Sequence, residues 1–199
     1  MANRREVLQA AMGVTALPFV AKLNLAQAAD RMHFQTLVYD KRFEAGVAFA
    51  RKFEGQGFSI HAISGDVTDL WYKELYYRWR SNPVAIAGLT THGSLFCLEH
   101  LAWEHRLRLT YLAEHSQCSD GEVEHTLSDP QSRILRADIN ALRFAGERWP
   151  ESLAELIVRN SVAASTAIPN VFVGRNGMTR SGHAQESLFS WVLTPLRHA

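Results

Sequence analysis

The chain has 199 residues, of which 47% are hydrophobic and 21% are charged. This composition is typical of a globular protein and excludes collagen-like, disordered and multi-span membrane classes. The 21 basic and 20 acidic side chains leave a formal charge of +1, so charge gives no argument for a nucleic-acid partner. The length predicts one domain that buries a core without disulfide or metal staples.

Residues 1–28 have the features of an export signal. A mostly apolar stretch from Ala10 to Leu25 follows a pair of arginines, and Ala26-Gln27-Ala28 supplies the small-x-small pattern that signal peptidase accepts. The apolar stretch is too short and too interrupted to predict a membrane-spanning helix. An alternative interpretation is an amphipathic amino-terminal helix packed on the domain.

The segment Asn3-Arg4-Arg5-Glu6-Val7-Leu8-Gln9 resembles a twin-arginine translocation signal, in which two arginines precede any residue, an apolar residue and leucine. The resemblance implies periplasmic or secreted localisation and a mature chain of residues 29–199, and the length of that chain predicts a single domain. Such a signal is an address read by a receptor and not an anchor, so no stable membrane span is expected after its removal. It also implies cargo that folds before export and often carries a cofactor or travels with a partner that does.

The two cysteines, Cys97 and Cys118, would then face an oxidising compartment. A disulfide between them is possible there, but the sequence does not give their separation. The alternative is an isolated thiol, since Cys97 falls in a helical pattern.

The first half of the mature chain alternates between strand and helix patterns. Apolar β-type runs at residues 36–39, 58–64 and 84–89 are followed by segments with helical spacing or a helix cap at 43–53, 68–79 and 95–106. The third run is apolar on both faces, as expected in the middle of a covered parallel sheet. This order predicts a three-layer α/β domain with a mainly parallel sheet.

An antiparallel hairpin is expected to extend that sheet. Apolar residues alternate with others from Leu107 to Ala113, and Ser119-Asp120-Gly121 supplies turn chemistry before a return strand carrying Val123, His125 and Leu127. A helix that continues to about His115 is the alternative. Further along, we expect a mainly helical region over 129–160, a short strand at 170–173 and an apolar run at 188–193.

Polar residues gather where the three parallel strands are expected to end, and ligands bind at this edge of open parallel sheets. The candidate ligand-binding residues are Lys41, Arg42, Asp66, Thr90, Thr91 and Ser94, and His92 is the candidate catalytic acid or base. A helix amino terminus there would favour a small anion. The alternative is that Thr90, Thr91 or Ser94 simply caps the helix.

Other chemistries find weak support in the sequence. No phosphate-binding or dinucleotide-binding glycine pattern is present, so no cofactor is predicted. Helical geometry separates His105 from His100 and Glu104, and no zinc motif is present, so no metal site is predicted. His115 and His125 could face one another across the predicted hairpin.

An aromatic run at 71–79 contains Trp71, Tyr72, Tyr76, Tyr77 and Trp79. Helical spacing places some of these rings together, which favours core packing. The remaining rings could form an adhesive surface on a second face of the helix.

Two functions therefore remain. The first is an exported small-ligand-binding or accessory protein, with a co-exported periplasmic redox enzyme as its candidate partner. The second is a small periplasmic enzyme that acts on an anionic substrate with His92 as acid or base. An enzyme requires a concave polar pocket at the strand ends, whereas an accessory protein requires an exposed apolar or aromatic patch.

Overall fold

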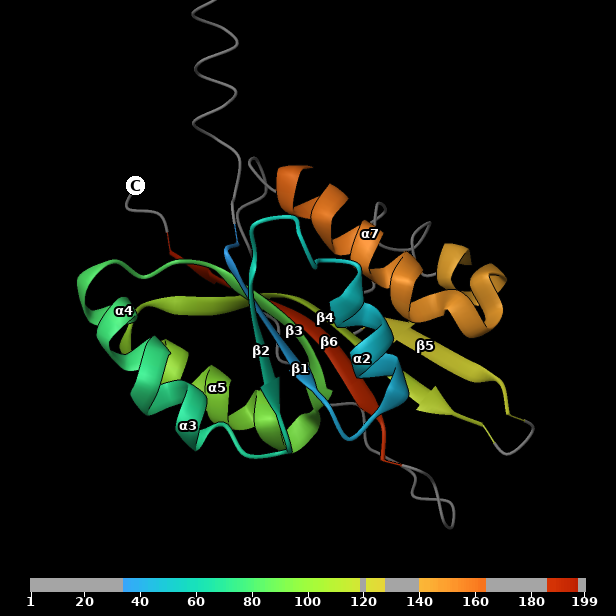
Figure 1. The fold of residues 1–199 in the computed structure, drawn as a ribbon, viewed down its shortest axis with the longest axis horizontal. Helices are drawn as coiled ribbons and strands as arrows, with labels where there is room; N and C mark the ends of the chain where they lie inside the picture. Colours follow the sequence, from blue (N-terminus) through green and yellow to red (C-terminus); the bar gives the residue numbers. More distant parts are fainter. Residues whose placement is uncertain (1–33, 119–120, 128–139, 164–185, 197–199) are drawn as a thin grey trace, which may run out of the picture.

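A computed structural model describes residues 34–118, 121–127, 140–163 and 186–196. The described strands form one sheet in the order β2-β1-β3-β6-β4-β5 (Figure 1). The strands are β1 (Thr36–Asp40), β2 (Ser59–Ile63), β3 (Ile86–Thr91), β4 (Leu107–Gln117), β5 (Val123–Leu127) and β6 (Leu188–Pro195). The helical elements are α2 (Glu44–Arg51), α3 (Thr68–Leu70), the π-helical η1 (Trp71–Leu75), α4 (Tyr76–Ser81), α5 (His92–Glu104), the 3-10 turn η2 (Gly146–Arg148) and α7 (Trp149–Ala163). The predicted α/β class is confirmed.

The first three strands form the parallel part of the sheet. β1 lies between β2 and β3 and runs parallel to both. All six residues of β3 are buried, which fits the apolar character of this segment on both faces. The strand begins and ends later than the predicted range 84–89. Val84 precedes the paired segment and is partly exposed.

The remaining strands add an antiparallel part. β6 pairs antiparallel with β3 on one side and with β4 on the other, and β4 forms the predicted hairpin with β5. The strand interpretation of residues 107–113 is confirmed, and β4 continues to Gln117 with a register shift between Leu109 and Tyr111. The hairpin therefore joins the parallel strands through β6, which the sequence showed only as an apolar run.

Two clusters of buried side chains join the helices to the sheet. In one cluster, Phe49 of α2 and Leu153 of α7 pack with Leu37 of β1. In the other, Trp79 of α4 and Leu98 of α5 pack with Val38, the next residue of β1. Successive strand residues point to opposite faces, so the two helix groups cover different faces of β1. Figure 1 shows α2 and α7 on one side of the view and α3, α4 and α5 on the other.

The segment predicted as one helix at 68–79 is a run of α3, η1 and α4. Trp71 and Trp79 are buried and pack edge to face, with ring centroids 6.0 Å apart. Tyr72 and Tyr77 are exposed instead. Core packing is therefore confirmed for the two tryptophans, and the adhesive surface stays a prediction for the exposed tyrosines.

The predicted export signal and the predicted strand at 170–173 lie outside the described residues. Among the residues that are described, no helix combines the length and apolar character needed to cross a bilayer.

The close approach of β3 and β6 depends on Gly88. A methyl group added there would lie 2.7 Å from the Val38 carbonyl oxygen and closer still to the Trp191 indole. We expect Gly88→Ala to lower the free energy of unfolding by about 3 kcal/mol, because neither the backbone nor the buried ring can move aside easily. Urea denaturation measures this change.

Gly93→Ala in the first turn of α5 is the matched control, since an added methyl group meets no atom within 4 Å. It should leave stability equal or raise it slightly, because alanine favours a helix. Equal effects of the two substitutions would contradict the proposed packing role of Gly88.

Candidate functional site

The loops after β1, β2 and β3 meet as the parallel topology predicts. Ser94 in the first turn of α5 donates a hydrogen bond to the Gly65 carbonyl oxygen over 2.8 Å. A methyl group added at Gly65 would lie 2.8 Å from Nη2 of Arg42, so the Arg42 guanidinium lies beside this turn. One residue from each predicted loop therefore contributes to a shared cluster at the carboxyl ends of the strands.

Arg42 is held by a carboxylate that the sequence interpretation treated only as the end of a strand. Its Nε and Nη2 donate to the two carboxylate oxygens of Asp40 over 2.9 and 2.6 Å. Asp40 is fully buried, whereas Arg42 is exposed. Its hydrogen bond to Asp40 raises the pKa of Arg42. The Arg42 guanidinium compensates the buried Asp40 carboxylate, so a ligand would have to compete with this internal partner.

The hydroxyl groups near β3 are also engaged. Thr90 and Thr91 are buried, and Thr90 accepts a 2.9 Å hydrogen bond from Nε1 of Trp191. The Oγ atoms of Thr91 and Ser94 are 3.3 Å apart. Thr91 occupies the amino-terminal cap position of α5 but makes no side-chain hydrogen bond to the helix backbone. These groups connect α5, β3 and β6 within the protein.

Lys41 and Asp66 lie on a different side of the cluster. They line a shallow groove of about 420 Å³ beside β2, together with His61, Lys73 and Glu74 among others. Asp66 accepts a 2.8 Å hydrogen bond from the Thr68 backbone N–H. Hydrogen bonding by the side chain and then the backbone of Thr68 lowers the pKa of Asp66. The groove is not lined by the residues predicted near β3.

His92 is the first residue of α5 and is exposed. Its ring contacts Phe189 and Phe96, with centroid separations of 5.3 and 6.4 Å. It is therefore associated with aromatic rings, and the structure does not place it in the groove that Lys41 and Asp66 line. The predicted site residues thus fall into three groups. Arg42, Thr90, Thr91 and Ser94 are buried or paired, Lys41 and Asp66 line the groove, and His92 is exposed.

His92 begins a row of rings along the solvent face of α5, which we call the α5 ring stripe: His92, Phe96, His100 and Trp103. Consecutive centroids lie 6.4, 4.1 and 4.9 Å apart. Phe96 is 48% exposed and Trp103 is 47% exposed, although both side chains are large and apolar. The spacing of these four residues matches successive turns of one helix face, and this was the signal that the sequence interpretation missed.

The opposite face of α5 anchors the stripe. Leu95, Leu98 and Ala102 are buried in the core cluster that contains Trp79. His105, just beyond the helix, is partly buried, and its ring lies 5.6 Å from that of Trp71. The rings of the stripe are therefore presented by a helix that is fixed from below.

The structure does not join the two cysteines. Cys97 on α5 and Cys118 after β4 are both free and exposed. No group of three or more His, Cys, Asp or Glu side chains in the described part of the chain is arranged to hold a metal ion.

A second cluster of polar side chains is buried between β4, β5 and β6. His115 and His125 face one another across the hairpin, with their Nδ1 atoms 2.7 Å apart. His115 Nε2 lies 2.7 Å from Ser190 Oγ, and Ser190 donates to the Tyr111 hydroxyl over 3.3 Å. We call these four residues the histidine network. The ring of Trp149 covers both imidazoles.

Each neutral imidazole of the histidine network carries a single N–H. One of the two facing Nδ1 atoms therefore donates to the other. Burial lowers the pKa of His115 well below its ordinary value, and His125 lowers it further. Burial also lowers the pKa of His125 to about 4, with a smaller contribution from Arg143.

A serine hydrogen-bonded to a histidine is also the arrangement of a nucleophile and its base. Here Ser190 is fully buried and His115 is 3% exposed, so a substrate has no access to either. The network therefore stabilises the contact between the hairpin, β6 and α7.

The network predicts a dependence of stability on pH. Imidazoles in the unfolded chain titrate near pH 6.5, whereas in the folded protein the pKa of His125 is lowered to about 4 and that of His115 lies well below its ordinary value. The unfolded chain binds more protons between these values, so the free energy of unfolding should fall as the pH drops from about 6.5 toward 4. Urea denaturation at several pH values measures the slope.

The double variant His115→Gln/His125→Gln should be less stable at pH 7.5 but show a shallower slope below pH 6.5. His100→Gln changes an exposed imidazole and should keep the slope of the parent protein. A double variant that retains the full slope would show that other groups cause the acid sensitivity.

No family model, curated protein or solved structure matches this chain. The functional proposal therefore rests on the geometry of the described residues.

Proposed function

We propose that the protein is an exported accessory protein that binds another protein through the α5 ring stripe. The observation that carries this proposal is the exposure of about half of Phe96 and Trp103 on a helix whose other face is buried. Large aromatic side chains in a contiguous exposed group are characteristic of binding surfaces.

The stripe suits a protein partner with an apolar groove. Phe96, His100 and Trp103 follow one face of α5 at helical spacing, which is how a helix presents anchors to a groove. The His100 ring lies between the other two and its Nδ1 is 2.9 Å from the Phe96 carbonyl oxygen. Rings that already contact one another lose little conformational freedom on binding. Exposed Glu104 beside them supplies a polar rim.

The proposal also includes the cellular location of the protein and its export route. Residues 1–28 act as a twin-arginine signal, and residues 29–199 form one three-layer domain that reaches the periplasm or the exterior in folded form. The resemblance of residues 3–9 to such signals supports the route. The two helix groups with separate core clusters support the layered arrangement. A co-exported redox enzyme is the partner class that this route suggests.

The enzyme alternative has less support from the geometry. Arg42 is paired with buried Asp40, Thr90 with Trp191 and Ser94 with Gly65, so three of the predicted groups are already engaged. Lys41 lines a shallow groove, and His92 lies with the aromatic rings. A small anionic ligand would have to compete with these internal partners.

A photo-crosslinking residue at position 103 tests the docking surface in cells. We expect a discrete crosslinked partner there and none from the same residue at position 77, because Tyr77 is more exposed than Trp103 but lies on α4. Phe96→Asp, combined with the crosslinker at 103, should remove the product, because a carboxylate would need desolvation in an apolar groove.

Mass spectrometry identifies the partner, and circular dichroism checks that Phe96→Asp folds. The same products from positions 103 and 77, or no product from 103, would contradict the proposed surface.

Replacement of both Arg4 and Arg5 by lysine tests the export route. We expect the variant to fold and remain in the cytoplasm, whereas the parent protein begins at or near Ala29 in the exported fraction. Cell fractionation and amino-terminal sequencing give the result. Export of the lysine variant, or an uncut parent protein in that fraction, would reject the signal.

A further inference from the structure

The outer edge of the sheet at β2 presents unpaired backbone groups. Ser59 N–H donates to Gln35, and the Ile63 carbonyl accepts from Lys41, so the polar groups of residues 59, 61 and 63 face β1. Backbone groups of successive strand residues point in opposite directions. Those of Ile60 and Ala62 therefore point away from the sheet, and β2 has no neighbour on that side in the described part of the chain.

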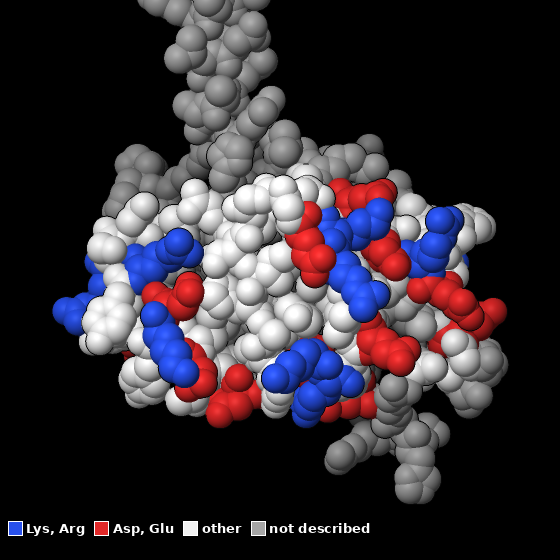
Figure 2. Space-filling model, viewed as in Figure 1, with Lys and Arg blue, Asp and Glu red and all other residues white. Residues whose placement is uncertain are grey.

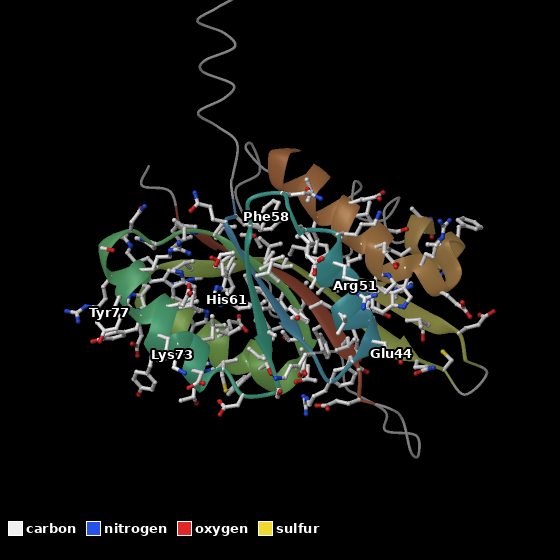
Figure 3. All side chains as sticks on the ribbon, viewed as in Figure 1. Glu44, Arg51, Phe58, His61, Lys73 and Tyr77 are labelled. Carbon is white, nitrogen blue, oxygen red and sulfur yellow. The ribbon has the colours of Figure 1, made fainter. Side chains whose placement is uncertain are left out.

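The β2 strand itself lacks the charged side chains and proline that usually prevent strand pairing, and its His61 contacts the Glu74 carboxylate of η1 at 3.2 Å. The sequence of β2, Ser-Ile-His-Ala-Ile, contains no Lys, Arg, Asp, Glu or Pro. Proteins normally protect an open edge with charge, proline or a bulge. β5 at the opposite edge carries the exposed carboxylate of Glu124. Figure 2 shows an uncharged area at the centre of the β2 face with charged groups on either side, and Figure 3 places Phe58 and His61 there.

In both helical runs beside β2, an acidic residue lies near the start and a basic residue lies near the end. α2 begins with Glu44 and ends with Arg51. The α3–α4 run has Asp69 near its start and Arg80 in its last turn. Both runs return from the carboxyl end of one strand to the amino end of the next, so Glu44 and Asp69 lie toward the carboxyl end of β2, where Lys41 also lies, and Arg51 and Arg80 lie toward its amino end. Figure 3 shows Glu44 and Arg51 on one side of β2.

We propose that β2 pairs antiparallel with β2 of a second copy of this chain, across a two-fold axis at His61. In this register Ile60 and Ala62 exchange backbone hydrogen bonds with Ala62 and Ile60 of the second copy. Phe58 pairs with Ser64 of the second copy in the same way, and His61 faces its own equivalent. The two sheets become one continuous sheet, and the interface is isologous.

Charge favours a second copy over an extended peptide as the occupant. Antiparallel pairing brings the start of α2 toward the end of α2 in the second copy, so Glu44 approaches Arg51 of the second copy. Asp69 already pairs with Lys73 of its own chain over 2.8 Å, so α2 carries this argument. A lone peptide strand would satisfy the backbone groups but would bring no partner for Glu44 and Arg51.

This dimer is independent of the proposed docking function. α5 packs against β3, β4 and β6, which lie away from the β2 edge in the strand order. The α5 ring stripe stays exposed in the dimer. Loss of one interaction therefore leaves the other measurable.

Sedimentation equilibrium of the full-length protein tests the pairing. We expect a dimer whose dissociation constant rises at least tenfold in Ala62→Lys, which places a charge at the edge, and in Ala62→Pro, which removes an outward N–H. Ala62→Val keeps the N–H and should remain dimeric. Thr126→Lys on exposed β5 is the control for added charge and should also remain dimeric.

A cysteine at position 61 tests the register. In a background with Cys97→Ser and Cys118→Ser, His61→Cys should form a disulfide-linked dimer under mild oxidation, whereas Ser59→Cys should not. A monomeric parent protein at 100 μM, or a dimer unaffected by both Ala62→Lys and Ala62→Pro, would overturn the proposal. Crosslinking through Ser59→Cys instead of His61→Cys would overturn the register and the two-fold axis.

Discussion

The contact between Trp191 and β3 holds the two parts of the sheet together. The indole lies against Gly88, where no side chain intervenes, and its Nε1–H donates to buried Thr90. This hydrogen bond satisfies a polar atom that would be costly to bury alone. β6 can therefore enter between β3 and β4, and its position sets the antiparallel pairing with each of these two strands.

Other polar side chains of the protein also find partners within the fold. At the carboxyl ends of the parallel strands, Asp40 engages Arg42 and the Gly65 carbonyl engages Ser94. These contacts fix the start of α5, whose inner face is closed by Leu98 and its neighbours. Rigidity at the base of the helix gives Phe96 and Trp103 a fixed position in solvent, which is the property a docking surface needs.

The sequence predicts the features of this protein that depend on local pattern. The β-α alternation from Thr36 to Thr91 and the hairpin with facing His115 and His125 follow from periodicity and turn chemistry. The insertion of β6 does not, because it depends on a ring in one strand fitting a glycine in another about a hundred residues away. The burial of Asp40 and the exposure of Phe96 likewise depend on tertiary neighbours that the spacing of residues does not reveal.

The position of β6 in the chain has a kinetic consequence. The Trp191 to Thr90 hydrogen bond spans 101 positions, and contacts between distant segments form slowly because a long loop must close first. Until β6 arrives, β3 and β4 each lack a neighbour, and their apolar residues lie open to other chains. Nascent molecules should therefore pass through a stage that is prone to aggregation, and a chaperone that covers β3 during synthesis would raise the yield of native protein.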